Sequence, residues 1–227
     1  MHDEKRREFY SKAYKEGVTK ITNQEAPKLE IVLEWMKAEV KDKKCRIVDI
    51  GCSEGVFLEH FRRNIANCEF IGVDISDAAI KGVKKRGFKG HVCDLETEQL
   101  PFKSESIDGV YCGDIIEHIF DIDRFLAELK RVLKGDGWTI FTTPNIASLA
   151  NRLRLFVGQD LFMSHIENIE HVRFFTCQSI KQLLVSKSFK VEKLITRNLV
   201  IPYFARIRII KNGLGNLGEK IILMVRK

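Results

Sequence analysis

The sequence predicts an α/β fold in which a mostly parallel sheet carries helices on both faces. Short apolar runs of strand length alternate with stretches of helical spacing between residues 45 and 145. The first run leads into a turn with glycine at its first and last places, Gly51 and Gly55. Acidic residues lie at or next to the ends of three of the runs, at Asp49, Asp74 and Asp94. The alternation predicts right-handed strand–helix–strand units in a single sheet.

The predicted elements follow one another in a regular order. A helix over residues 25–40 places Leu29, Val32, Leu33 and Met36 at helical spacing and precedes the first strand. Helices are expected over 56–65 and over 77–86, the second with an N-cap at Ser76 or Asp77. A third helix is expected from an N-cap at Asp121 or Asp123 to Leu133, and Gly135 terminates it. Strands are expected at 47–50, 70–74, 88–93, 107–112 and 137–143.

The last third of the chain departs from this order. A helix near 177–187 leads to an alternating strand at 189–196, and the chain closes on a strand at 220–226. No crossover helix of normal length fits between these two strands unless residues 203–211 supply it. Residues 145–175 fit neither a core strand nor a core helix. We expect them to form an insertion over the carboxyl ends of the strands, where such sheets bind ligands.

Length and charge limit the function classes. The 227 residues suit one large domain, or one domain with a small additional lobe. Residues 176–227 carry 11 Lys/Arg and 2 Asp/Glu, so they supply more than the whole net charge of +7. This basic quarter is either a solvated surface or a contact for an anionic substrate, a membrane surface or nucleic acid. It lacks the interleaved aromatic residues typical of nucleic-acid binding, which makes that partner the least favoured.

The apolar runs and the cysteines indicate a cytoplasmic protein. No apolar run approaches the roughly 20 residues that cross a bilayer, and the charged N-terminus lacks the apolar segment of a signal peptide. The six cysteines form no CxxC pair. We therefore expect all six to be reduced and mostly buried thiols.

The glycine turn indicates a nucleoside site. Glycines in such a turn let the backbone approach a ligand, and the helix that follows directs free N–H groups toward it. Asp74 follows Gly55 by 19 residues, the usual distance for an acid that binds a ribose diol.

Four segments in series resemble class I S-adenosylmethionine (SAM)-dependent methyltransferases. They are VDIGCSEG (48–55), FIGVDIS (70–76), CDLETEQLPFKSESIDGVYCGDIIEHI (93–119) and LKRVLKGDGWTIFTTPN (129–145). Ser53 departs from the commoner glycine of that family. The resemblance implies a Rossmann-like, seven-stranded sheet, mostly parallel, with an antiparallel last strand. It also implies one domain over 1–227, divided into an N-terminal helical lid (1–44), a SAM-binding core (45–145) and a substrate-side insertion with the C-terminal strands (146–227).

The same resemblance implies a role for each cofactor-binding residue. Asp49 would contact the methionine amino group, and the turn backbone at Gly51, Cys52 and Ser53, closed by Gly55, would face the methionine moiety. Asp74 would accept both ribose hydroxyls. The remaining contacts are Ile75 beside the adenine ring, Asp94 on its amino group, the Leu95 N–H near the ring, and Gly113 at the reactive end.

Residues around the acceptor are less sharply defined. HVRFFT (171–176), with the helix and strand after it, resembles the small-molecule branch that includes ubiquinone-type O-methyltransferases. Asp114, Glu117 and His118 are spaced i, i+3, i+4, which places them on one helical face. In that branch a set of this spacing resembles a divalent metal site suited to Mg²⁺, although the Glu-His pair is structural in metal-free relatives. His171 is the leading candidate for a general base, followed by His118; His165 and Glu167 are weaker alternatives. Tyr10 and Tyr14 are candidates to line a lid.

The expected function is transfer of the SAM methyl group to a small-molecule or lipid- or sugar-linked acceptor, at oxygen. Three alternatives remain open at this point: a nucleic-acid methyltransferase, a SAM-binding module without activity, and a nicotinamide oxidoreductase. The oxidoreductase is disfavoured because its usual turn is GxGxxG, whereas the turn here is Gly51-x-Ser53-x-Gly55.

Overall fold

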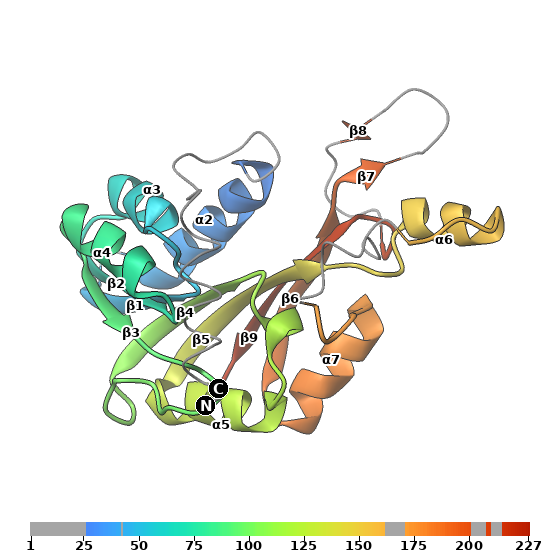
Figure 1. Cartoon of the computed structure of the whole chain (residues 1–227). Helices are drawn as coiled ribbons and strands as arrows, with labels where there is room; N and C mark the ends of the chain where they lie inside the picture. The colour runs from blue at the N-terminus through green and yellow to red at the C-terminus, as the bar shows by residue number, and fades with distance from the viewer. Residues whose placement is uncertain (1–25, 42, 162–170, 201–207, 210–214) are drawn as a thin grey trace.

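A seven-stranded sheet forms the centre of the molecule (Figure 1). The computed structural model describes residues 26–41, 43–161, 171–200, 208–209 and 215–227. The strand order across the sheet is β3-β2-β1-β4-β5-β9-β6. The bounds are β1 Cys45–Ile50, β2 Cys68–Asp74, β3 Lys89–Val92, β4 Ile107–Gly113, β5 Leu133–Pro144, β6 Lys190–Arg197 and β9 Lys220–Arg226.

The strand directions confirm the predicted fold class. Strands β1 to β5 pair in parallel, whereas β9 is antiparallel to both of its neighbours, β5 and β6. The chain therefore inserts its last strand between two strands that run with the rest of the sheet. This arrangement is the mostly parallel sheet with an antiparallel last strand that the sequence predicts.

Helices cover both faces of the sheet, as predicted. Figure 1 shows α2 (Ala26–Val40), α3 (Val56–Asn64) and α4 (Asp77–Lys85) on one face. On the other face lie α5 (Ile122–Val132) and α7 (Cys177–Ser186). Side chains on β9 alternate between the two layers: Leu223 packs with the α5 and α7 side, and Met224 with the α2 and α3 side. Alternation of this kind requires a strand that is buried on both faces.

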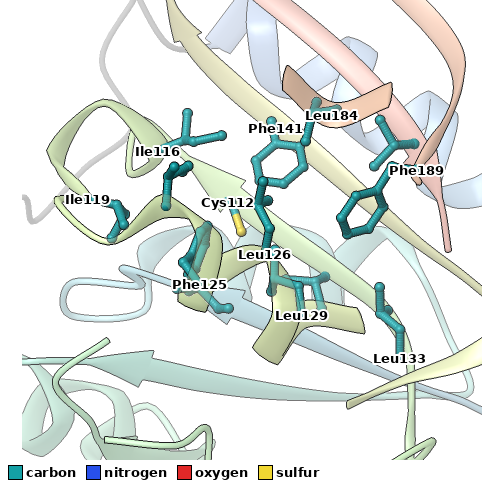
Figure 2. Close-up of a cluster of buried hydrophobic side chains, with 14 of the residues drawn as sticks. Cys112, Ile116, Ile119, Phe125, Leu126, Leu129, Leu133, Phe141, Leu184 and Phe189 are labelled. Atoms are coloured by element: carbon teal, nitrogen blue, oxygen red, sulfur yellow. The ribbon is translucent and has the colours of Figure 1, made fainter. Parts of the chain in front are cut away.

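Two apolar layers therefore hold the sheet. In the layer of Figure 2, Phe125, Leu126 and Leu129 of α5 pack against Phe141 of β5 and Leu184 of α7. These five side chains are at most 1% exposed. Packing of this density fixes α5 against β4 and β5, and so fixes the carboxyl ends of those strands.

Three local predictions are corrected. Residues 145–175 contain a helix, α6 (Leu149–Phe156), whose N-cap Ser148 accepts a hydrogen bond from the Asn151 N–H. Helix α5 ends at Val132, before the predicted Leu133, and β5 begins at Leu133 rather than at Gly137. A two-stranded ladder, β7 (Leu199–Val200) with β8 (Arg208–Ile209), lies in the region left open for a crossover helix.

The prediction that all cysteines are reduced is wrong for two of them. Cys45 and Cys68 form a disulfide between β1 and β2. These residues are direct partners in the parallel register, with their Cα atoms 4.6 Å apart, a separation that a disulfide spans readily. The other four, Cys52, Cys93, Cys112 and Cys177, are buried thiols as expected.

No helix in the described ranges combines the length and the apolar character needed to cross a membrane.

Candidate functional site

A cleft opens at the carboxyl ends of the parallel strands, where β1 and β4 lie side by side. We call it the main cleft; its volume is about 810 Å³ including its open mouth. Chain order reverses at this point, because β1 connects toward β2 and β3 while β4 leads toward β5. Gly51, Asp74, Asp94 and Asp114 line it, each at or just beyond the end of one of these strands. Open α/β sheets bind ligands at such a switch point.

The glycine turn after β1 has the backbone geometry that makes glycine necessary. Gly51 and Gly55 have φ angles of 72° and 81°, in the left-handed region. A Cβ atom at Gly51 would collide with the side chain of Ile115, which also lines the cleft. Ser53 lies in the same backbone region with φ 48°, which explains why glycine would suit this position. Gly51 thus contributes bare backbone to the wall of the cleft.

Asp74, the last residue of β2, is buried and fixed by backbone N–H groups. Its Oδ2 accepts a hydrogen bond from Ser53 at 2.9 Å, and its Oδ1 accepts one from Ser76 at 2.9 Å. Burial raises the pKa of Asp74, and these hydrogen bonds partly offset the rise. Each carboxylate oxygen can accept a second hydrogen bond, so the group is oriented and can still accept from a pair of hydroxyls.

Asp49 and Asp94 add two more buried carboxyl groups. Oδ2 of Asp49 is buried and has no hydrogen-bond partner in the part of the chain that the structure describes. Burial, together with the negative charge of Asp74, raises the pKa of Asp49 well above its usual value. Oδ1 of Asp94 accepts a hydrogen bond from the Glu96 N–H at 3.0 Å. A buried carboxylate oxygen without a donor favours a ligand that supplies an N–H group.

Asp114 pairs with two lysines from opposite ends of the chain. Lys28 of α2 lies 2.6 Å from Asp114 Oδ2, and Lys220 of β9 lies 2.9 Å from Oδ1. Burial acts to raise the pKa of Asp114, but Lys220 and Lys28 outweigh it and hold that pKa well below its usual range. The Lys28 side chain is only 5% exposed. An ammonium so deeply buried depends on its carboxylate partner.

Glu117, His118 and His171 form a second group beside the main cleft, here called the Glu-His-His cluster. Ligand atoms of the three residues lie within 4.8 Å of one another. His118 lines the main cleft, and its ring meets that of His171 edge-on, with centroids 4.7 Å apart. Burial and the charge of Asp114 raise the pKa of Glu117 to about 8. Burial and the proximity of His118 lower the pKa of His171.

The magnesium set expected from the sequence does not fit this geometry. Asp114, Glu117 and His118 were expected to share one helical face, but Asp114 precedes the short helix η2 (Ile116–His118) and has φ 56°. Both Asp114 carboxylate oxygens accept hydrogen bonds from ammonium groups, of Lys28 and Lys220. His171, not Asp114, completes the group whose ligand atoms converge. Two imidazoles and one carboxylate are poor ligands for magnesium, which prefers oxygen.

Most of the predicted cofactor residues gather at one end of the sheet. The main cleft is lined by Gly51, Asp74, Ile75, Asp94 and Leu95 among them. Gly55 closes the turn beside α4, and the Cys52 thiol packs against Gly72 instead of entering the cleft. Gly113 ends β4, and a Cβ there would strike the Tyr111 ring. The predicted alternatives Tyr10, Tyr14, His165 and Glu167 lie outside the described residues.

Sequence reasoning missed Lys28, Lys220, Ile115 and Phe120. Lys28 lies four residues before Val32 and eight before Met36, on the buried face of α2. A lysine at an apolar position of a helix is a sequence signal for a buried ion pair. Phe120 lines the main cleft, and the residue is 66% exposed. Lys220 begins β9, and nothing in its sequence neighbourhood indicates that it reaches Asp114.

Comparison with known proteins finds similarity to methyltransferases. Residues 48–141 match the family model described as "Methyltransferase domain". The chain is 28% identical over 146 residues to a probable S-adenosylmethionine-dependent methyltransferase of Mycobacterium tuberculosis, covering 63% of this chain and 48% of that protein. It is 33% identical over 105 residues to a ubiquinone biosynthesis O-methyltransferase of Bradyrhizobium, covering 44% and 40%. The chain thus spans about half or less of the length of these relatives.

Solved structures confirm the fold. A SAM-dependent methyltransferase from Thermotoga maritima, titled a possible histamine N-methyltransferase, superposes with a TM-score of 0.63 at 23% identity, covering 88% of this chain and 90% of that one. A geranyl diphosphate C-methyltransferase from Streptomyces coelicolor gives 0.57 at 14% identity, covering 87% and 80%. At these identities the likeness extends to the fold alone.

The family implies SAM as the cofactor, and the cleft fits that expectation. Gly51 lines the cleft with backbone that carries no side chain, and the Oδ2 atom of Asp49 lacks a donor among the described residues. A ligand with an ammonium group and a ribose diol would meet both features and Asp74. On this sheet, this turn and these matches, residues 48–141 form a methyltransferase domain similar to those of SAM-dependent methyltransferases.

Proposed function

We propose that this protein transfers the methyl group of SAM to a hydroxyl oxygen of a small-molecule or lipid- or sugar-linked acceptor. The observation that carries the proposal is the convergence of Gly51, Asp74, Asp94 and His118 on one cleft at the switch point of the sheet. Relatives whose names include ubiquinone biosynthesis O-methyltransferase and malonyl-[acyl-carrier protein] O-methyltransferase support transfer to oxygen. SAM, when bound, supplies a sulfonium whose methyl group is already electrophilic.

The residues on the β1 to β3 side would hold the donor. Asp74 would accept the ribose hydroxyls with the lone pairs that Ser53 and Ser76 leave free. Asp94 and the Leu95 N–H would contact the adenine edge, with Ile75 against its ring. Asp49 would accept from the methionine ammonium group, because its Oδ2 has no other donor among the described residues. The backbone of residues 51–53 would face the methionine chain, close to Gly113.

The residues after β4 would hold the acceptor. Phe120 offers an exposed ring at the cleft, and Phe174 lies 6.4 Å from His171, centroid to centroid. These rings suit an acceptor with a planar or apolar part. His118 lines the cleft, so it would contact the acceptor hydroxyl, and His171 lies directly behind it. Burial is the main cause that lowers the pKa of His171, so its imidazole is neutral near neutral pH.

Alignment of the two substrates would supply most of the rate. Holding reactants in line is worth effective molarities of ~10⁵–10⁸ M, or about 7–11 kcal/mol. General-base assistance typically adds only ~10²–10⁴-fold. Replacing a histidine should therefore slow the reaction without abolishing SAM binding. Magnesium has no part in this proposal, because both carboxylate oxygens of Asp114 are paired with lysines.

The donor assignment is tested by isothermal titration calorimetry with SAM. Asp74→Ala should weaken binding at least tenfold, whereas Asp77→Ala, an exposed acid three residues further along, should bind like the wild type. Because Asp74 also orders the backbone at Ser53, thermal unfolding of each variant is recorded alongside. Asp94→Asn provides a second variant on a different contact. Wild-type affinity in folded Asp74→Ala would refute the ribose assignment.

The reaction is tested by release of S-adenosylhomocysteine with hydroxylated aromatic acids and malonyl thioesters as acceptors. A product heavier by one methyl group and carrying an O-methyl resonance is the expected result. His118→Ala should lower kcat while the Kd for SAM stays within about twofold. Tight SAM binding without turnover on any acceptor would favour a binding module instead.

A further inference from the structure

The Glu-His-His cluster contains two buried polar atoms that the fold leaves unsatisfied. Oε1 of Glu117 and Nδ1 of His171 are buried, and neither has a hydrogen-bond partner in the described residues. Each such atom costs about 1–3 kcal/mol when it has no partner. The two residues come from segments 54 positions apart in the sequence, yet their ligand atoms lie within 4.8 Å of each other. One bound cation would satisfy both.

The surroundings hold the cluster in a fixed arrangement. Thr143 of β5 donates a hydrogen bond to Glu117 Oε2 at 3.0 Å, which leaves Oε1 as the oxygen available to a ligand. The Glu117 carbonyl accepts hydrogen bonds from the Val172 and Arg173 N–H groups, each at 3.0 Å. These bonds join the segment after His171 to η2. Outer contacts of this kind orient the ligands of protein metal sites.

We propose that Glu117, His118 and His171 bind a divalent transition-metal ion, with Zn²⁺ as the first candidate. Two imidazole nitrogens and one carboxylate oxygen form the ligand set of a class of zinc sites in which a fourth position stays open to water or substrate. Imidazole also suits iron, nickel and copper, whereas magnesium and calcium prefer oxygen. The structure thus favours an ion of a different class from the one that the Asp114 spacing suggests.

Distances and charges are compatible with such an ion. Ligand atoms about 2.0–2.2 Å from zinc in a tetrahedral site lie roughly 3.4 Å from one another. In this structure they lie within 4.8 Å of one another, so side-chain rotations that move each atom by about 1 Å would bring them into place. The neighbouring charges are Asp114, Lys220 and Lys28. Both ammonium groups are paired to the Asp114 carboxylate, which reduces their repulsion of a cation. Asp114 itself remains outside the ligand set.

His118 links this site to the main cleft, because it belongs to the cluster and also lines the cleft. An ion held there would face the region in which the acceptor is proposed to bind. The metal site does not depend on methyl transfer, since it is measured without SAM. A failed metal titration leaves the SAM assignment standing, and failed SAM binding leaves the metal site standing.

The test is a Co²⁺ titration of tag-free, chelator-treated protein, followed by visible absorption, with Zn²⁺ added in competition. One equivalent of Co²⁺ should bind and give tetrahedral d–d bands, and Zn²⁺ should remove them. Glu117→Gln and His171→Ala should each weaken Zn²⁺ binding at least tenfold. His91→Ala removes a half-buried imidazole outside the cluster and should bind like the wild type.

Two outcomes would overturn the proposal. One is the absence of stoichiometric Co²⁺ and Zn²⁺ binding by the wild-type protein. The other is binding that Glu117→Gln and His171→Ala leave unchanged while their unfolding curves show a native fold. If Mg²⁺ bound instead, and Asp114→Asn abolished its binding, the ligand set would be the one expected from the sequence.

Discussion

The pairing of Lys28 with Asp114 predicts a large loss of stability when the carboxylate is neutralised. Asp114→Asn keeps the size of the side chain, and asparagine tolerates the left-handed backbone at this position. The change leaves Lys28, 5% exposed, without its partner at 2.6 Å. Breaking a buried ion pair by removing one member costs about 3–5 kcal/mol. Because Asp114 and Lys220 are 27% and 30% exposed, we expect the low end, about 3 kcal/mol.

Urea unfolding of the unliganded protein measures this loss. With a slope of about 2–3 kcal/mol/M, the midpoint should fall by roughly 1–1.5 M while the slope stays constant. The matched control is Asp108→Asn. Its ion pair with Lys134 is equally short at 2.7 Å, but the lysine is 42% exposed. This control should lose less than about 1 kcal/mol. Equal losses in the two variants would refute the reasoning from burial.

A compensating variant and the pH dependence sharpen the test. Lys28→Met combined with Asp114→Asn should regain most of the lost stability, since an apolar side chain replaces the stranded ammonium. The folded-state pKa of Asp114 is depressed by Lys220 and Lys28, in excess of the effect of burial. Its contribution is therefore fully present above the unfolded pKa near 4 and is lost as the pH falls below that value. The gap between wild type and Asp114→Asn should close in acid.

Two further predictions concern the β1 turn and the acid before it. Asp49→Asn should stabilise the unliganded protein by an amount that grows as the pH rises above about 4, because the raised pKa of Asp49 in the folded state makes its ionisation costly. The same variant should bind SAM more weakly. Urea unfolding at several pH values and calorimetry with SAM measure the two effects, and a variant less stable than wild type at neutral pH would contradict the first. Ser53→Gly should raise the free energy of unfolding by up to about 1 kcal/mol, because the relief of strain in the left-handed backbone exceeds the entropic cost of glycine. Thermal unfolding checks this, and a lower melting temperature would contradict it.

The sheet and the donor side of the cleft could be predicted because their signals are local. Each parallel strand is a short apolar run, and Asp49, Asp74 and Asp94 lie at the end of such a run or next to it. Parallel strands bring their carboxyl ends to one edge, so local sequence order alone places these acids together. The glycine turn is equally local, since its φ angles at Gly51 and Gly55 depend on neighbouring residues.

The features that were missed depend on pairings between distant segments. The Cys45–Cys68 disulfide follows from the register of β1 with β2, which the spacing of 23 residues does not reveal. Lys220 reaches Asp114 only because β9 inserts beside β5, and Lys28 does so from a helix 86 residues earlier in the chain. Helix α6 has an ordinary N-cap at Ser148, but exposed Leu155 and Phe156 obscure its pattern.

The backbone geometry after β4, rather than the sequence spacing, determines which groups the carboxylates of Asp114 and Glu117 contact. In an α-helix, residues three apart would face the same way. Asp114 instead adopts a left-handed conformation with φ 56°, and only a short helical turn follows it. Asp114 consequently joins the lysines of α2 and β9, whereas Glu117 joins His171. Two lysines thus keep the Asp114 carboxylate ionised, whereas burial keeps the Glu117 carboxyl protonated near neutral pH. A cation that displaced the Glu117 proton would leave both carboxylates with a negative charge.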